Sequence, residues 1–189
     1  MTQLLRKMVL VGFQVLIFLV YKAYSVEGIN ALLLLMPAKL IVPVLRRYGA
    51  TIGDGAQIHS PLVIHNASAE PGRHYAHLVI GDHCYVGRDV LFDLREAIVL
   101  EDYVTVSMRC TLLTHTDAGE RPSAYTLPRL PAICAPIHIH SGAYLGACST
   151  VLQGITVGAN AIVGAGALVR CDVAEGATVA GVPARRIEP

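Results

Sequence analysis

The side chain in this sequence best suited to moving protons is His115, which follows Thr111–Thr114 and opens a long segment rich in proline. Imidazole titrates near neutral pH, so it can take a proton from an attacking group and give one to a leaving group. On residue type alone, however, a lone histidine is more often a surface or structural residue than a catalytic one. The role of His115 therefore depends on the elements that position it. His138 and His140 flank Ile139 and are expected to point outward from one strand, either as surface residues or beside a ligand channel. The other five histidines receive no role: His59, His65, His74, His77 and His83.

A repeat of six residues dominates the second half of the chain. Six successive units begin with an aliphatic residue, and the fifth residue of each unit is small or aliphatic. The first residues of these units are Ile139, Leu145, Val151, Val157, Val163 and Val169. An amphipathic helix would repeat every 3.6 residues and a strand every two. A period of six predicts one short strand and one turn per unit, with three units forming one triangular coil whose aliphatic residues fill the core.

The same six-residue period is present earlier in the chain, beginning at Ile52. It has two interruptions and one slip, a place where two extra residues separate successive aliphatic positions. The slip lies between Phe92 and Leu100, which are eight residues apart, and predicts a bulge at a corner. The interruptions predict loops at 66–77 and 116–136. We therefore predict an all-β fold, a left-handed parallel β-helix of hexapeptide repeats over residues 49–187, preceded by an apolar helical segment at 1–48. Because His115 ends a unit and opens the second loop, it is expected at a coil edge beside a cleft.

The N-terminal segment contains two short apolar runs flanked by cations. Residues 8–20 form the first run, which is too short to cross a bilayer alone. Residues 29–45 form the second, which Pro37 and Pro43 interrupt. This pattern predicts an interfacial anchor, in which residues 1–45 contact the cytoplasmic leaflet of a membrane. The alternative is a pair of helices packed on the β-helix or between subunits. We expect a cytoplasmic protein, peripheral on the inner face of the membrane.

Composition excludes several other classes of protein. The formal net charge of +1 gives no electrostatic basis for binding nucleic acid. The five cysteines include no Cys-x-x-Cys pair, which favours reduced thiols. No glycine-rich phosphate loop follows a strand, so a fused nucleotide-binding domain is not expected.

Several stretches of the chain resemble the hexapeptide-repeat acyltransferases, and most of all the maltose, galactoside and colanic-acid (capsule) O-acetyltransferases. The resemblance covers about Ile52 to Ile187, and its most specific parts are Thr111–His115, Ala143–Ala147, Val163–Val169 and Gly181–Arg185. It implies an enzyme that uses acetyl-CoA as acyl donor, with His115 as general base. It also implies a homotrimer with active sites between subunits.

The same resemblance implies where acetyl-CoA binds. Its pantetheine arm is expected along the last coils, against small or aromatic residues, and its phosphates are expected to meet arginine side chains, which suit phosphate by charge and geometry. Members of the family often carry tryptophan where this chain has Tyr144. The implied pantetheine contacts are Tyr144, Ala147, Gly164 and Ala165, and the implied phosphate contacts are Arg170 and Arg185.

Asp93 is the candidate acceptor residue. Serine acetyltransferases place a catalytic histidine directly after an aspartate near the slip, but this chain has Leu94 there, so serine is not expected as the acceptor. In the sugar acetyltransferases this neighbourhood contributes to the acceptor site. Asp93 is therefore expected either to hydrogen-bond sugar hydroxyls or to brace the bulge. The sequence leaves open which carboxylate, if any, orients His115; Asp117 and Glu120 are near it only in sequence.

Together with the resemblance, these observations predict transfer of an acetyl group to a hydroxyl of a saccharide. The apolar N-terminus suggests that this saccharide is lipid-linked or a precursor of a cell-surface glycan. Two alternatives remain open: N-acylation of an amino sugar or another amine, and a non-catalytic trimeric scaffold. A zinc site between subunits, as in γ-class carbonic anhydrases, would need three histidine ligands. The spacing of His83, His115 and His138 or His140 does not resemble that motif, so no metal is expected.

Overall fold

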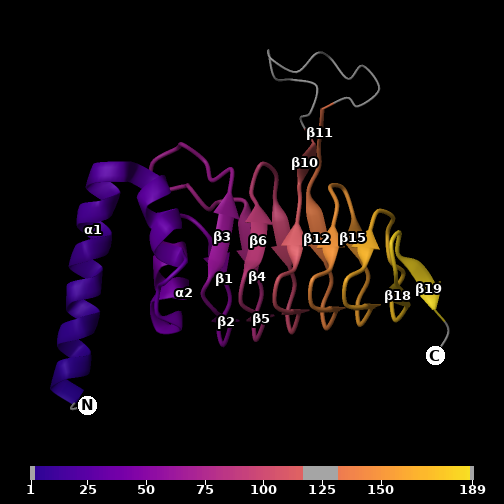
Figure 1. Ribbon diagram of the computed structural model, residues 1–189, viewed down its shortest axis with the longest axis horizontal. Helices are drawn as coiled ribbons and strands as arrows, with labels where there is room; N and C mark the ends of the chain where they lie inside the picture. Colours follow the sequence, from indigo (N-terminus) through magenta and orange to yellow (C-terminus); the bar gives the residue numbers. More distant parts are fainter. Residues whose placement is uncertain (1–2, 117–131, 188–189) are drawn as a thin grey trace.

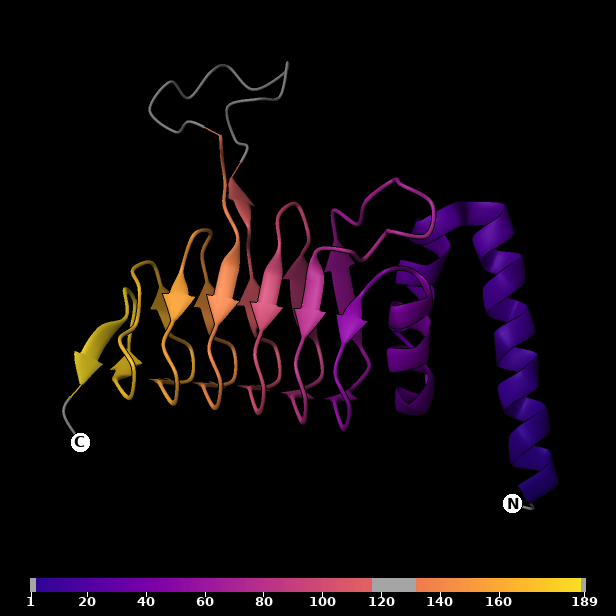
Figure 2. The same ribbon diagram turned by 180° about the vertical axis from the view of Figure 1, so that it is seen from behind.

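The computed structural model describes residues 3–116 and 132–187, which form two helices followed by a three-sided stack of short strands (Figures 1 and 2). The first face contains β1 (Thr51–Ile52), β4 (Leu78–Ile80), β7 (Ile98–Leu100), β12 (Ile137–Ile139) and β15 (Thr156–Val157). The second contains β2 (Gln57–Ile58), β5 (Tyr85–Val86), β8 (Thr105–Val106), β13 (Tyr144–Leu145), β16 (Ile162–Val163), β18 (Thr178–Ala180) and β19 (Arg185–Ile187). The third contains β3 (Leu62–His65), β6 (Val90–Asp93), β9 (Thr111–Leu112), β14 (Thr150–Val151) and β17 (Leu168–Val169).

Successive coils stack in register, so the first residue of each repeat unit joins a continuous core. On the first face, for example, Ile80 pairs with Leu100 and Leu100 with Ile139, and all three side chains are buried. Neighbouring coils run parallel and satisfy each other's backbone groups, and at the last coil β19 pairs antiparallel to β18. This is the parallel β-helix that the repeat predicts, and it is consistent with the left-handed form.

Two helices cover the N-terminal end of this core. Helix α1 (Gln3–Leu33) is kinked at Ser25, where φ is 53°, and α2 (Ala38–Arg47) runs between α1 and the first coil (Figure 1). The buried face of α2 seals the end of the β-helix, with Ile41 and Leu45 fully buried. Arg46 donates hydrogen bonds to the carbonyl of Ile52 at 2.6 and 2.9 Å, which satisfies an exposed edge of the first coil.

The predicted all-β class is too narrow, because these helices are an integral part of the core, whereas the predicted helical N-terminus is confirmed. The segment predicted as a polar loop at 66–77 contains two fully buried side chains. Tyr75 donates a hydrogen bond to Asn30 of α1 at 2.9 Å, and Nε2 of His74 lies 3.0 Å from the hydroxyl of Tyr21. The loop therefore packs between α1 and the β-helix and hydrogen-bonds to α1, instead of only covering the surface of the β-helix.

The second predicted loop, 116–136, leaves the stack between the third and first faces. Its two ends pair as β10 (His115–Thr116) and β11 (Ile133–Cys134), which are antiparallel and project from the side of the prism (Figure 1). Residues 117–131 lie outside the described part of the chain.

Candidate active site

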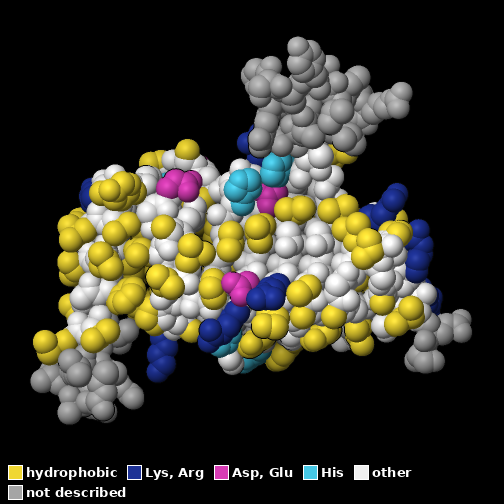
Figure 3. Space-filling view, in the orientation of Figure 1, with side chains coloured by type: hydrophobic (Ala, Val, Ile, Leu, Met, Phe, Trp, Pro, Cys, Tyr) yellow, Lys and Arg dark blue, Asp and Glu magenta, His cyan; other side chains and the backbone are white. Residues whose placement is uncertain are grey.

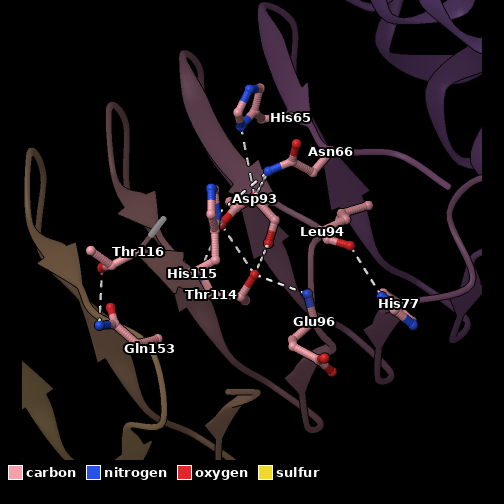
Figure 4. Close-up of polar contacts among 10 residues, drawn as sticks. All are labelled: His65, Asn66, His77, Asp93, Leu94, Glu96, Thr114, His115, Thr116 and Gln153. Carbon is pink, nitrogen blue, oxygen red and sulfur yellow. Dashed lines mark hydrogen bonds and ion pairs between the residues drawn. The ribbon is translucent and has the colours of Figure 1, made fainter. Parts of the chain in front are cut away.

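The structure brings His115 and Asp93 together at the edge between the third and first faces. Asp93 ends β6 and His115 begins β10, one coil further along, because Phe92 of β6 pairs with Leu112 of β9. Nδ1 of His115 lies 2.5 Å from Oδ2 of Asp93 (Figure 4). The Asp93 side chain is fully buried, whereas that of His115 is 15% exposed at the base of the projecting pair.

Neighbouring donors hold both oxygens of Asp93. Thr114 donates its backbone N–H to Oδ2 at 2.9 Å, and its hydroxyl lies 3.1 Å from the same atom. Asn66 donates to Oδ1 at 2.7 Å, and Nδ1 of His65 lies 3.7 Å from Oδ1. Burial alone would raise the pKa of Asp93, but the hydrogen bonds from His115, Asn66 and Thr114 outweigh it and hold the pKa below its usual value. The buried group is therefore a charged carboxylate.

This geometry favours the second of the two predicted roles of Asp93, bracing of the bulge, over the binding of a sugar hydroxyl. A fully buried carboxylate whose two oxygens both accept hydrogen bonds from the protein has no surface left for a sugar hydroxyl. Asp93 is also the carboxylate that contacts Nδ1 of His115, which the sequence left unidentified. Asp117 and Glu120, the alternatives that are close in sequence, lie outside the described residues.

The arrangement fixes the chemistry open to His115. A carboxylate that accepts a hydrogen bond from Nδ1 selects the tautomer with its proton on that atom, so Nε2 is the nitrogen that can take a proton. The same carboxylate stabilises the imidazolium that forms when it does. A histidine held in this way can act first as general base and then as general acid.

Sequence reasoning missed three residues around this pair. Asn66 and Thr114 hold the carboxylate, and Gln153, on the next coil, donates to the hydroxyl of Thr116 at 3.1 Å (Figure 4). The side-chain oxygen Oε1 of Gln153 is buried, and the described residues offer it no hydrogen-bond donor. Only the strand register could have indicated these residues, since they come from three separate coils. Figure 3 shows histidine side chains on the surface of the upper edge of the β-helix.

The residues predicted to contact the pantetheine arm of acetyl-CoA lie elsewhere on the chain. Tyr144 belongs to the second face, where it stands in register with Ile162 and, through β8, with Tyr85. These three outward side chains are each 41–45% exposed and form an apolar stripe. Ala147, Gly164 and Ala165 follow the strands of this face, at its corner with the third face. A groove of about 440 Å³ runs beside that corner, lined by residues that include Tyr85, Arg88 and Ala147.

The two predicted phosphate contacts are also separate from one another. Arg170 follows β17, on the same edge of the prism as His115, and is exposed. Arg185 lies on β19 beside an open hollow of about 280 Å³ at the last coil, and donates to the carbonyl of Ala184. Arg88, which the sequence did not single out, is the arginine that lines the groove with Ala147. The chain thus places His115 and the expected donor groove on different edges of the prism.

Comparison with known proteins agrees with this architecture. Residues 136–171 match a family model described as the hexapeptide repeat of succinyl-transferase. The 2,3,4,5-tetrahydropyridine-2,6-dicarboxylate N-acetyltransferase of Staphylococcus aureus is 45% identical over 58 residues, which are 31% of this chain and 24% of that protein. The chain thus spans about a quarter of the length of the curated relatives that it matches.

Solved structures resemble the chain over most of its length. A hexapeptide-repeat acetyltransferase from Vibrio cholerae, in complex with acetyl-CoA, superposes with a TM-score of 0.70 at 19% identity, covering 89% of this chain and 90% of its own. A galactoside acetyltransferase in complex with coenzyme A gives a TM-score of 0.70 at 19% identity, over 86% of this chain and 77% of its own. The chain has the fold of the hexapeptide-repeat acetyltransferases. This confirms the predicted resemblance as far as repeat and fold are concerned.

Proposed function

We propose that this chain is an acetyl-CoA-dependent O-acetyltransferase whose acceptor is a hydroxyl group of a saccharide. The observation that carries the proposal is the His115–Asp93 pair, a histidine fixed by a buried carboxylate at the edge of a β-helix. Acetyltransferases with this fold, including a galactoside acetyltransferase, have been solved with acetyl-CoA or coenzyme A bound.

In the proposed reaction Nε2 of His115 removes the proton of the acceptor hydroxyl as its oxygen attacks the thioester carbonyl. The tetrahedral intermediate then collapses, the carbon–sulfur bond breaks, and the imidazolium returns the proton to the departing thiolate. Asp93 stabilises the positive charge on the ring between these steps.

The donor fits the second face by size and charge. Small side chains at Gly164 and Ala165 allow an extended pantetheine to approach the backbone, and the exposed Tyr144 offers an aromatic wall. Arg88 and Arg185 supply positive charge at two ends of this surface. Because His115 lies on another edge, we propose a homotrimer in which the donor surface of one subunit faces His115 of its neighbour.

Steady-state release of coenzyme A with a panel of mono- and disaccharides tests the proposal. His115→Ala should lower acceptor-dependent release by at least about 10²-fold, the contribution expected of a general base. His83→Asn, a change of an exposed histidine away from the edge, is the matched control. Equal rates in wild type and His115→Ala would overturn the catalytic assignment.

N-acylation is the second candidate, and the Staphylococcus aureus relative, which is an N-acetyltransferase, favours it. Amino sugars in the same panel separate the two reactions, since an amine acceptor would yield an amide that resists mild alkaline hydrolysis, whereas an ester would be cleaved. Absence of any acetyl-CoA binding would instead support a non-catalytic scaffold.

We also propose that α1 holds the protein on the cytoplasmic leaflet of a membrane, where the enzyme would meet a lipid-linked acceptor. The candidate span Val11–Leu33 has a mean hydropathy of 1.4 and only 22% of its 18-residue window is buried. Val11, Val15 and Leu19 are 53–58% exposed on the N-terminal part of α1, here called the α1 arm. Apolar side chains cover much of the surface at this end of the molecule (Figure 3). Lys22 and Glu27 lie inside the span, so an interfacial position suits α1 better than a crossing.

Vesicle flotation tests the membrane proposal without disturbing the cap. Because α2 seals the β-helix, deletion of 1–45 would open the core, whereas Val11→Lys, Val15→Lys and Leu19→Lys together change only exposed positions. This triple variant should remain in the dense fraction, and Gln14→Lys, which adds a charge on the same arm, should float like wild type. Flotation of the triple variant would exclude the apolar arm as the anchor.

A further inference from the structure

Three polar side chains converge on the outer side of the first face, away from the His115 edge. Glu101 directly follows β7, while His138 lies within β12 and His140 directly follows it. Leu100 pairs with Ile139, and both point into the core, so the two histidines flanking Ile139 point outward beside Glu101. A His-x-His pair on a strand places both imidazoles on one face.

The three side chains meet at a single oxygen atom. Oε1 of Glu101 lies 2.9 Å from Nε2 of His138 and 2.9 Å from Nδ1 of His140. The two rings stack with centroids 4.3 Å apart and an angle of 19° between their planes. The other oxygen, Oε2, accepts hydrogen bonds from the backbone N–H and the hydroxyl of Ser141, each at 3.0 Å.

The two oxygen–nitrogen distances are close to those of a tetrahedral metal site. Zinc binds imidazole nitrogen and carboxylate oxygen at about 2.0–2.2 Å, which places neighbouring ligand atoms about 3.3–3.5 Å apart. The two oxygen–nitrogen separations therefore need to widen by only about 0.5 Å. One potential ligand atom from each residue lies within 4.8 Å of the others, and among the described residues this is the one such group of three histidine, cysteine or acidic side chains.

We propose that Glu101, His138 and His140 form a binding site for a divalent transition-metal ion such as Zn²⁺, with water as the fourth ligand. Two imidazoles and one carboxylate are the donor set that such ions take in proteins. The hydrogen bonds from Ser141 hold the carboxylate in place, as outer contacts do in metal sites. All three side chains are 35–42% exposed, so an ion can reach them from solvent.

An ion here would link two successive coils. Glu101 and His138 are 37 residues apart, and the chain between them passes through His115 and the projecting segment. The site is separate from the proposed catalytic pair, so its occupancy can be measured without reference to acyl transfer.

Titration of the chelator-treated, full-length protein with Zn²⁺ in the absence of coenzyme A tests the proposal, with Co²⁺ as a spectroscopic probe. Wild type should bind one ion per chain, show visible absorption of four-coordinate Co²⁺, and gain thermal stability with Zn²⁺. Glu101→Gln and His140→Ala should each weaken binding by about 100-fold or more. Ser141→Ala, which leaves all three ligands, should weaken it by about 10-fold.

His83→Asn provides the control, because His83 is exposed, lies outside the cluster and has a φ of 54° that asparagine tolerates. It should bind like wild type, as should His115→Ala. The proposal is overturned if wild type takes up no ion at one per chain, or if Glu101→Gln and His140→Ala bind as tightly as wild type. If a variant does not fold, the Co²⁺ spectrum of wild type still tests the site, because it shows whether the bound ion is four-coordinate.

Discussion

At the scale of single residues, the pair of His115 and Asp93 explains how a solvent-facing edge of a β-helix can support proton transfer. Asp93→Asn should lower kcat by about 10²–10⁴-fold, because an amide no longer selects the tautomer with the proton on Nδ1 and no longer stabilises the imidazolium. The KM for acetyl-CoA should change little, since the donor surface lies on another face. Glu96→Gln makes the same carboxylate-to-amide change nearby and should keep most of the activity. Comparable kcat values for the two variants would contradict the orienting role.

The lowered pKa of Asp93 also predicts an acid-sensitive contribution to stability. A carboxyl group whose pKa is lower in the folded than in the unfolded chain stabilises the fold above its unfolded pKa, here the ordinary 3.8, and this contribution disappears as the pH falls through the folded pKa. Urea unfolding at pH 6 should therefore find Asp93→Asn less stable than wild type by about 1–3 kcal/mol. The difference should shrink steadily below about pH 4. A difference that stays constant down to pH 2 would show that the charge is not responsible.

The sequence singled out both His115 and Asp93 but did not pair them, because Asp93 was expected to bind the acceptor or to brace the bulge. Both residues could be recognised as candidates in the sequence, but they are 22 positions apart, so nothing local indicates that they are in contact. What was missing was the strand register, which places Phe92 against Leu112 and so brings the two side chains onto adjacent coils. The roles of Asn66 and Gln153 depend on the same three-dimensional stacking, and no local pattern marks them.

At the scale of elements, close stacking of the coils makes some glycines essential for steric reasons. A Cβ atom on Gly146 would lie 2.6 Å from the nitrogen of Ala165 and 2.7 Å from the oxygen of Val163, which accepts the hydrogen bond of Gly146 itself. Gly146→Ala should therefore lower the free energy of unfolding by about 1–3 kcal/mol, because backbone atoms must move apart. Thermal and urea unfolding measure this loss.

Gly166 offers the matched comparison. It has a φ of 69°, and a Cβ atom added there would meet nothing within 4 Å, so Gly166→Asn should be nearly neutral, given that asparagine tolerates this conformation. A larger loss of unfolding free energy for Gly166→Asn than for Gly146→Ala would show that backbone conformation, not the spacing of the coils, requires glycine at these positions.

The sequence predicted strands and helices with different success. A period of six specifies a strand and a turn directly, because each aliphatic residue must face the core. The apolar N-terminus specified helices but not what covers them, since hydropathy does not distinguish lipid from protein. The structure divides the segment: α2 buries Leu40, Ile41 and Leu45 against the β-helix, whereas the arm of α1 leaves much of its apolar surface exposed.

At the scale of the whole molecule, the separation of His115 from the donor groove has a consequence that can be measured. If the groove of one subunit faces His115 of its neighbour, each active site in the trimer draws on two chains. Two variants that are each inactive, one lacking the base and one lacking the groove, would then complement each other. His115→Ala removes the base, and Ala147→Trp places a bulky side chain in the groove, which Ala147 lines.

Co-expression of these two variants with different tags, followed by purification through both tags, isolates the mixed trimers. Around a three-membered ring, either mixture has one place where an intact His115 faces an intact groove, so about one third of the wild-type activity should return. Separately purified variants that are combined without exchange of subunits should stay inactive. If the mixed trimers are as inactive as either parent, His115 and its donor groove belong to the same chain, and the groove must then be sought on the edge that carries Arg170.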